Sequence, residues 1–453
     1  MLFSRALEIL ACPGKSDIIR INYHVYHIER HHTSMNRGFV RVKARIADAL
    51  GTAVLSKRFM AFVGVHTCFL IFTSLHGIFI NTLLIRVTGD NSITLWYNVI
   101  YYFCFAISMP LGAIFMRKTS PSISLRTGIL LYISMYVAFF ALMLTGTLGM
   151  GMPIIAVLSA FAATAYWIAY NVLLIEFTSE DNRDVGISLM GMSSGLVSLI
   201  MPSVSGVVIA AFQGMGGYYV MFGLSLAVAI LTIALIVLKI PSIASKTKST
   251  YFKLAMHDIL TTKVWKICMI CEFVKGLREG TFAFFLNVLL FDLVQNEALI
   301  GLNTFLASLL GILANWATSR FLHPNNRVRW ILISVTVLFT ANCMLFLKLD
   351  AVTIILMSVI NAFFNIVLLN PLASILFSLF ARTENGAQAK YEFLGIKDCL
   401  LGIGRGVGVV IVLLFPPTRK GYLIAMCVLT ATQYISAFLA SRAVKQLDAQ
   451  QQA

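Results

Sequence analysis

Two apolar stretches, residues 267–291 and 393–415, contain charged side chains that a membrane-spanning helix would bury. These charges are Lys275, Arg278, Glu279, Lys397, Asp398 and Arg405. Neither stretch can be shortened to exclude its charges and still cross a bilayer, which takes about 20 apolar residues. Charge held at membrane depth is costly and normally faces a water-filled cavity or a charged partner. The two stretches therefore indicate a polar pathway through the membrane.

Three kinds of chemistry fit these residue types. Arg278, Arg405 and Lys275 can bind an anionic group, which arginine suits because its planar fork grips carboxylate or phosphate. Glu279 or Asp398 can exchange a proton that drives transport. Alternatively, the acids and bases pair between helices and position the bundle without touching a substrate. Two basic residues are left over after pairing, which favours an anionic substrate or substrate moiety.

Helical spacing places several of these charges on shared faces. Lys275 lies four residues before Glu279 and three after Glu272, so an intrahelical network can partly neutralise the group. Asp398 and Arg405 are seven residues apart and again lie close to one face. The glycines that surround Arg405 allow another helix or a ligand to approach the backbone, and they are Gly402, Gly404, Gly406 and Gly408.

The composition is that of an integral membrane protein. The 453 residues are 59% hydrophobic and 12% charged, and a soluble domain has about twice that charged fraction. The net charge of +16 is read as basic residues gathered in cytoplasmic loops, so we expect no nucleic-acid partner. The eight cysteines lie almost entirely in apolar segments, and we expect no disulfide framework, no metal site and no cofactor.

Twelve apolar stretches of spanning length form two sets of six, separated by a polar, basic segment. We expect an all-α membrane protein with an N-terminal six-helix bundle (51–240), a cytoplasmic linker (241–266), a C-terminal six-helix bundle (267–443) and a cytoplasmic tail (444–453). The expected spans are 58–87, 93–116, 124–147, 152–177, 185–212, 218–240, 267–291, 300–318, 330–347, 351–380, 393–415 and 421–440.

The distribution of lysine and arginine predicts that both termini are cytoplasmic in a multi-pass protein of the cell membrane. The outer connections hold few basic residues, whereas the inner ones hold most of them. The outer ones are Arg86, Lys348, Arg419 and Lys420. Residues 1–50 are basic and rich in histidine, and we expect them to be disordered or to include a mis-started N-terminus.

The two halves of the chain are weakly alike, which supports a duplicated bundle. Asn171 in the fourth span is followed by Arg183, and Asn370 in the tenth is followed by Arg382 at the same separation. Two sets of six spans with a basic central linker resemble the major facilitator superfamily over residues 55–443. After the second span, the family's glycine-to-basic signature is matched in part by Gly112, Arg117 and Lys118, without the family's aspartate before the arginine.

The resemblance implies two pseudo-symmetric six-helix halves around a central cavity that opens alternately to each side. It implies that the first, fourth, seventh and tenth spans line the cavity, and that the second, fifth, eighth and eleventh form its gates. The expected gating residues, which include the acidic end of the fourth span, are Arg117, Lys118, Glu176, Arg183 and Arg320.

Polar residues on the spans that are expected to line the cavity are candidates for substrate contact. In the tenth span, Asn361 and Asn365 recur at helical spacing. In the first half, the candidates are Asn81, Tyr170 and Asn171, and His76 is a candidate proton carrier. The alternative for each is hydrogen bonding or packing between helices.

We expect a secondary active transporter, not an enzyme, that moves a small anionic or amphiphilic solute as a monomer with protons as the coupling ion. No nucleotide-binding Gly-x-x-x-x-Gly-Lys-Ser/Thr loop is present, which argues against a pump. One alternative is a lipid or drug exporter or flippase of the same fold, because an arginine-rich half beside an apolar half suits an amphiphile. The other is a membrane-embedded transferase, for which the acidic loop 176–184 is the only hint.

Overall fold

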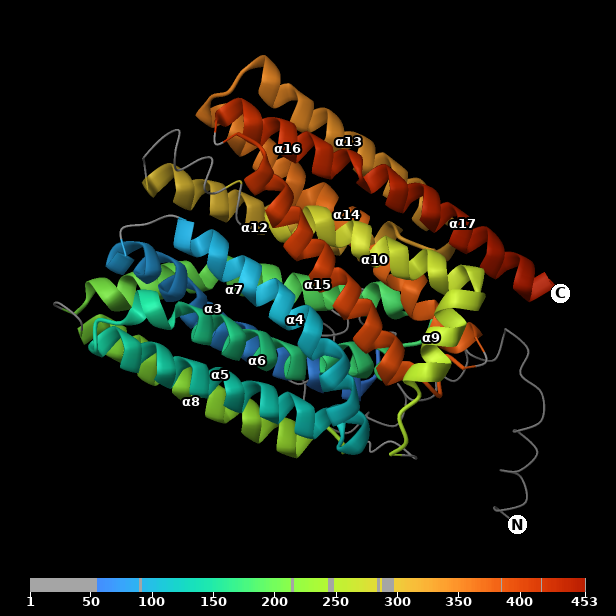
Figure 1. The fold of residues 1–453 in the computed structure, drawn as a ribbon, viewed down its shortest axis with the longest axis horizontal. Helices are drawn as coiled ribbons and strands as arrows, with labels where there is room; N and C mark the ends of the chain where they lie inside the picture. The colour runs from blue at the N-terminus through green and yellow to red at the C-terminus, as the bar shows by residue number, and fades with distance from the viewer. Residues whose placement is uncertain are drawn as a thin grey trace, which may run out of the picture. The chain divides into compact units, whose positions relative to one another are not determined.

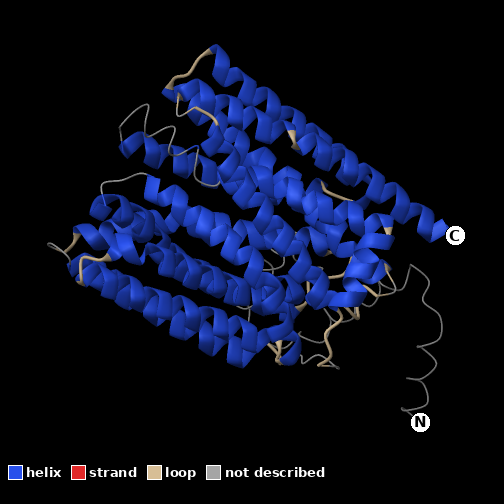
Figure 2. Cartoon of the chain, viewed as in Figure 1, coloured by secondary structure: helices blue, strands red, loops and turns tan. Residues whose placement is uncertain are grey.

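The computed structural model describes residues 55–88, 92–212, 216–242, 248–282, 286, 297–383, 385–416 and 418–452. The predicted N-terminal segment, 1–50, lies outside these ranges. The described residues are helical with short connections, and no strand occurs among them (Figure 2).

The first six long helices match the first six expected spans to within about four residues at each end. They are α3 (Lys57–Thr88), α4 (Ser92–Lys118), α5 (Pro121–Leu144), α6 (Leu148–Phe177), α7 (Arg183–Ala210) and α8 (Gly216–Lys239). Helix α6 begins four residues before the expected 152, and α5 begins and ends three residues before the expected 124–147. The start of α5 is fixed because the Ser120 hydroxyl accepts a hydrogen bond from the Ile123 N–H and Pro121 occupies the first turn.

The linker contains a helix that the sequence did not predict, α9 (Phe252–Thr261). Ala255 and Ile259, one turn apart, are buried, and α9 contacts α10 and α15. The following helix, α10, begins at Lys263, four residues before the expected start of the seventh span. The linker is therefore shorter than the predicted 241–266 and partly structured.

The second bundle comprises the remaining helices. They are α10 (Lys263–Phe282), α12 (Glu297–Phe321), α13 (Arg327–Leu347), α14 (Ala351–Arg382), α15 (Lys390–Leu414), α16 (Arg419–Ala431) and α17 (Gln433–Gln452), with a short 3₁₀ turn, η3 (Pro324–Asn326). The expected last span is divided at Thr432, and α17 continues through the predicted tail.

Nine helices within the described ranges are long and apolar enough to cross a membrane. Helices α10 and α15 are not among them, because their charged side chains interrupt the apolar sequence. The chain is therefore a multi-pass membrane protein with charge-bearing helices inside its bundle.

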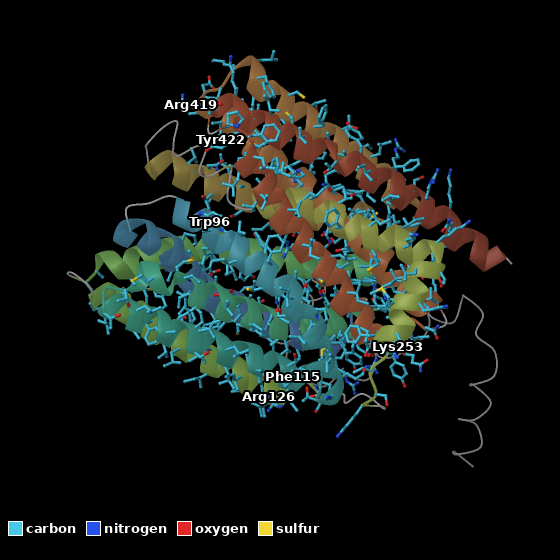
Figure 3. All side chains as sticks on the ribbon, viewed as in Figure 1. Trp96, Phe115, Arg126, Lys253, Arg419 and Tyr422 are labelled. Atoms are coloured by element: carbon cyan, nitrogen blue, oxygen red, sulfur yellow. The ribbon has the colours of Figure 1, made fainter. Side chains whose placement is uncertain are left out.

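The two bundles meet along two helix pairs, α4 with α15 and α7 with α12 (Figure 1). Helices α5 and α8 lie at one edge, and α13 and α17 lie at the opposite edge. Trp96, Arg419 and Tyr422 lie toward one end of the helices, and Phe115 and Lys253 lie toward the other (Figure 3). We call the second the linker end, because α9 lies there.

Candidate functional site

The backbones of α10 and α15 are in direct contact because glycines face the opposite helix. A Cβ atom added at Gly408 would lie 2.0 Å from the Leu277 carbonyl oxygen, and one added at Gly276 would lie 2.5 Å from that of Leu401. The other glycines noted in the sequence divide between two neighbours: Gly404 also faces α10, whereas Gly402 and Gly406 face Ala106 and Phe103 of α4. This close approach brings the charges of the two helices together.

Arg405 and Glu279 form an ion pair between α15 and α10. Arg405 Nη2 donates to Glu279 Oε1 at 2.9 Å, and the two side chains are 22% and 28% exposed. The rings of Tyr102 and Phe105, from α4, each lie 6.0 Å from the guanidinium carbon. Arg405 is thus bonded to an acid of the neighbouring helix. This is the interhelical pairing of acid and base that the sequence offered as an alternative to anion binding.

Two further ion pairs form within single helices. Lys275 Nζ lies 2.6 Å from Glu272 Oε2, and Lys397 Nζ lies 2.7 Å from Asp398 Oδ1. Lys275 therefore pairs with the acid one turn before it rather than with the one after it. Asp398 also accepts a hydrogen bond of 2.9 Å from Asn171 Nδ2, across the two bundles.

Arg278 has no carboxylate partner among the described residues. Its side chain is 2% exposed. Nη2 donates to Asn361 Oδ1, Nη1 donates to Asn365 Oδ1 at 2.6 Å, and Nε donates to the Thr430 hydroxyl at 3.4 Å. The guanidinium carbon lies 4.0 Å from the centre of the Phe282 ring. All three acceptors are neutral, so the positive charge is solvated by amides and a hydroxyl.

The expectation of two unpaired basic residues is therefore corrected to one among the charges at positions 272–279 of α10 and 397–405 of α15. The difference is Glu272, which the sequence-based tally left out and which neutralises Lys275. Arg405 is neutralised by Glu279, and Lys397 by Asp398. Arg278 carries the charge that remains.

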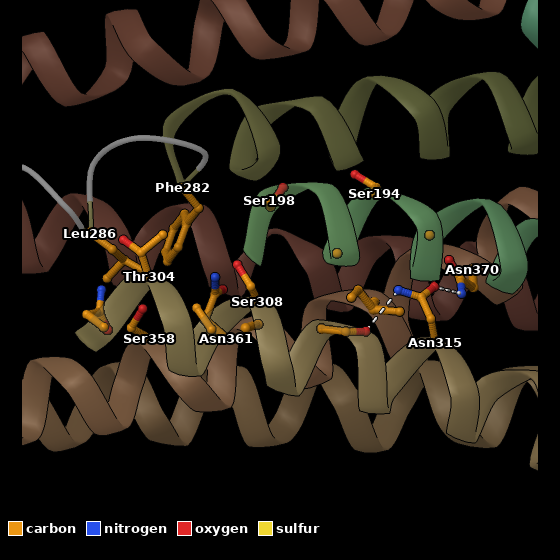
Figure 4. A pocket seen from close by; sticks show the side chains of 17 residues that line it. Ser194, Ser198, Phe282, Leu286, Thr304, Ser308, Asn315, Ser358, Asn361 and Asn370 are labelled. Carbon is orange, nitrogen blue, oxygen red and sulfur yellow. Dashed lines mark hydrogen bonds between the residues drawn. The ribbon is translucent and has the colours of Figure 1, made fainter. Parts of the chain in front are cut away.

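A cavity of about 430 Å³ lies between α7 of the first bundle and α10, α12 and α14 of the second (Figure 4). No charged side chain is among its described lining residues. Its polar lining consists of hydroxyl and amide groups: Ser194, Ser198, Asn303, Thr304, Ser308, Asn315, Ser358, Asn361 and Asn370. Phe282 also lines it, so both Phe282 and Asn361 connect the cavity to Arg278.

A hydrogen-bonded cluster joins the two bundles at one end of this cavity. Asn370 Nδ2 donates to Asn315 Oδ1 at 3.2 Å and to the Thr318 hydroxyl at 3.1 Å. The Ser188 hydroxyl of α7 lies 2.9 Å from that of Thr318. A Cβ atom added at Gly191 would lie 2.2 Å from Asn315 Oδ1, so a side chain at position 191 of α7 would displace the Asn315 amide of α12. Asn370 thus contributes to contact between the bundles.

In the first bundle, aromatic rings surround a buried histidine. His66 Nδ1 lies 3.0 Å from the Tyr166 hydroxyl, and the His66 ring packs against Tyr170 with 4.6 Å between ring centres. His76 and Asn81 lie on α3, but their side chains are outside the described part of the structure. Tyr170 is therefore placed beside His66, a residue that was not chosen as a site candidate.

Four ion pairs join the bundles at the linker end. Arg117 Nη2 lies 2.5 Å from Glu392 Oε2, and Arg327 Nη2 lies 2.7 Å from Asp184 Oδ2. The other two are Arg382–Glu180 and Lys390–Glu176. We call these the four bridging ion pairs. They hold the linker end closed.

The gating candidates from the sequence divide into two groups. Arg117 and Glu176 take part in bridging ion pairs. Lys118 and Arg320 are exposed, and Arg183 is 3% exposed; none of these three forms an ion pair with a described residue. Sequence analysis missed Glu392, which lies one residue before the expected eleventh span, 393–415, and in the first turn of the observed α15.

The described residues contain no group of three or more histidines, cysteines, aspartates or glutamates that could hold a metal ion. Cys268 and Cys271 have ligand spacing, but both are buried free thiols on α10.

Two helical bundles that meet over a polar cavity, with ion pairs closing one end, define a membrane transporter of the alternating-access class. The sequence matches the Major Facilitator Superfamily over residues 49–391, about three quarters of the chain. The chain belongs to the Major Facilitator Superfamily, and its fold is twelve transmembrane helices in two six-helix bundles. The exclusively helical, multi-pass fold expected from the sequence is thus confirmed.

Individual relatives are distant. YqgE of Bacillus subtilis strain 168, itself uncharacterised, is 23% identical over 381 residues, which cover 83% of this chain and 87% of YqgE. A bacterial homologue of the iron transporter ferroportin, in an outward-facing state, aligns with a TM-score of 0.68 at 10% identity over 86% of this chain and 99% of its own. FucP, the E. coli fucose:proton symporter, aligns in its outward conformation with a TM-score of 0.65 at 13% identity over 85% and 98%. These structures share the fold with this chain.

Proposed function

We propose that this secondary transporter moves a small, hydrophilic organic anion by alternating access. The observation that carries the proposal is Arg278, a buried cation whose described hydrogen-bond acceptors are all neutral. Two of its contacts, Asn361 and Phe282, line the cavity of about 430 Å³. A bound anion would supply the missing negative charge.

The charge balance of α10 and α15 within the membrane supports this proposal. Between positions 272 and 279 of α10 and between 397 and 405 of α15, four basic residues face three acidic ones, which leaves one positive charge, and the pairs account for all but Arg278. A charge held in low dielectric without a counter-charge is unfavourable by several kcal/mol. Bringing an anion near Arg278 relieves that cost, so binding of an anion is favoured over binding of a neutral or cationic solute.

The cavity lining supports a hydrophilic substrate rather than a lipid. Its hydroxyl and amide groups offer hydrogen bonds that an acyl chain would leave unsatisfied. Its volume falls in the usual range for small-molecule sites, roughly 300–1,000 Å³. We therefore favour a small solute over the lipid-flippase alternative.

The remaining parts of the proposal concern topology and coupling. The excess of basic residues at the linker end favours a cytoplasmic location for that end, with both termini on the cytoplasmic side of the cell membrane. With the four bridging ion pairs closed there, the cavity would face outward. Surface labelling of Lys420→Cys in intact cells tests this orientation, since residue 420 would lie outside the cell.

We further propose that the transporter is a monomer, with bundles of 51–240 and 267–443, and that it is coupled to protons through Asp398 or Glu279. Light scattering of the purified chain tests whether it is a monomer.

A thermal-shift screen of the purified full chain tests the anion proposal. The panel contains organic anions, with neutral and cationic analogues matched in size. We expect stabilisation by at least one anion, its loss in Arg278→Gln, and its retention in Arg442→Gln, which removes an equal charge from an exposed position on α17. Stabilisation only by cations or neutral compounds, or stabilisation that persists in Arg278→Gln, would contradict the proposal.

A further inference from the structure

The orientation of the Asn361 amide is fixed by the chemistry of its partner. A guanidinium has only hydrogen-bond donors, so the Asn361 atom that meets Arg278 Nη2 must be the oxygen Oδ1. The same reasoning fixes Asn365, whose Oδ1 accepts from Arg278 Nη1 at 2.6 Å. Both amides therefore use their acceptor on Arg278 and retain their Nδ2 donors.

The two amides differ in their surroundings. Asn361 lines the cavity, and Asn365 is not among its lining residues. No acceptor in the described part of the chain receives a hydrogen bond from Asn361 Nδ2. Figure 4 labels Asn361 and Ser308 among the polar side chains that line the cavity. The cavity is thus lined by an amide donor that is held in orientation and has no acceptor among the described residues.

We propose that Asn361 Nδ2 contacts an acceptor oxygen of the transported anion, and that Arg278 is a positioning residue that acts through this amide. The inference rests on the proposed anion site and identifies the contacting atom. A cation bound to Oδ1 polarises the amide and strengthens its N–H groups as donors. The ligand class is an organic oxyanion, with a carboxylate, sulfonate or phosphate oxygen at Asn361.

This arrangement explains how a 2% exposed arginine can select a ligand in a neighbouring cavity. The guanidinium can stay bonded to its acceptors, because it polarises the Asn361 amide and the amide N–H groups at the cavity wall bind the ligand. The cationic group of a ligand has no acceptor atom for Asn361 Nδ2 to bond. Selection therefore depends on both the charge of Arg278 and the orientation of Asn361.

Charged thiol reagents test the inference without knowledge of the natural substrate. The full chain carrying Ser308→Cys is treated with 2-sulfonatoethyl methanethiosulfonate or with its trimethylammonium counterpart. Intact mass measures the rate of modification by each reagent, and the chain without the substitution serves as the background. The ratio of the sulfonate rate to the trimethylammonium rate is divided by the same ratio for 2-mercaptoethanol, which gives the preference due to the site. We expect the sulfonate to be favoured. If neither reagent modifies Cys at position 308, the cavity does not admit small ions, and both this inference and the proposed function are overturned.

Matched substitutions separate the inference from the proposed function. Asn361→Leu and Asn365→Leu each remove one acceptor from Arg278 and keep its charge, but only the first removes the cavity donor. We expect the sulfonate preference to fall about tenfold in Asn361→Leu, as for loss of a hydrogen bond to a charged group, and by about threefold or less in Asn365→Leu. Equal ratios in the two variants would overturn the role of Asn361 and leave the anion proposal intact.

Two more variants complete the test. Asn361→Asp preserves a partner for Arg278, so it guards against a folding failure of the leucine variant, and it replaces the donor by an acceptor. We expect it to abolish the preference for sulfonate, and a preserved preference would overturn the inference. Arg278→Gln tests the proposed function separately: an unchanged ratio there would show that the arginine does not select anions.

Discussion

Asn171 Nδ2 donates a 2.9 Å hydrogen bond to Asp398 Oδ2 and so joins α6 of the first bundle to α15 of the second inside the membrane. The same carboxylate is paired with Lys397 at 2.7 Å. An alternating movement of the bundles must break or rearrange the bond to Asn171. Asp398 is therefore placed where gain or loss of a proton would change the contact between the bundles.

Substitution of Asp398 tests proton coupling. Asp398→Asn keeps a side-chain oxygen that can accept from Asn171, but it cannot exchange a proton. We expect substrate exchange across proteoliposomes to continue and accumulation driven by a pH gradient to be lost. Because Lys397 loses its counter-charge, the double variant Lys397→Met/Asp398→Asn serves as the control for folding.

Glu279 is the competing candidate for proton coupling. Accumulation that survives in Asp398→Asn and disappears in Glu279→Gln would transfer the coupling role to Glu279. Accumulation that survives in both variants would show that neither carboxylate couples proton movement to transport.

Arg117 and Glu392 should be strongly coupled in stability. Their side chains are 2% and 0% exposed, and removal of one partner from a buried pair typically costs about 3–5 kcal/mol. We expect Arg117→Gln and Glu392→Gln each to lower the thermal unfolding midpoint, and the double variant to lower it less than the sum of the two. Strict additivity of the two effects would argue against a direct interaction.

Arg405 and Glu279 should depend on each other for the stability of the protein. Arg405 is paired with Glu279 between α15 and α10, so we expect Arg405→Gln to destabilise the protein and Arg405→Gln/Glu279→Gln to recover most of the loss. Thermal unfolding of purified protein measures both. Failure of the double variant to recover stability would favour a direct role for Arg405 in substrate binding, as the sequence suggested.

Gly408 should be intolerant of any side chain. The added Cβ would lie 2.0 Å from the Leu277 carbonyl oxygen, so Gly408→Ala must push α15 away from α10, at a cost of about 1–3 kcal/mol. Gly223, on α8, has no atom within 4 Å of the corresponding position and is the matched control. We expect Gly223→Ala to be neutral or stabilising by up to ~1 kcal/mol. Equal melting temperatures for the two variants would contradict close packing of α10 on α15.

The sequence by itself determined the elements of the fold. Long apolar stretches interrupted by polar turns must become helices in a bilayer, because every backbone N–H and C=O group has to be bonded within the segment. The helix bounds therefore followed the apolar pattern closely, and α14 began at the expected residue, 351. The sequence did not predict α9, whose ten residues are too few to produce a spanning signal and whose burial depends on α10 and α15.

Only the tertiary structure decided which charges are paired. Sequence spacing relates residues on one helix, as for Glu272 and Lys275, but it carries no information on the distance between Glu279 and Arg405, which are 126 positions apart. That distance is set by the glycine contacts between α10 and α15. The sequence placed Arg278 and Arg405 together as anion-binding candidates, and packing separated them because one glutamate reached Arg405 while Arg278 was left with two asparagines.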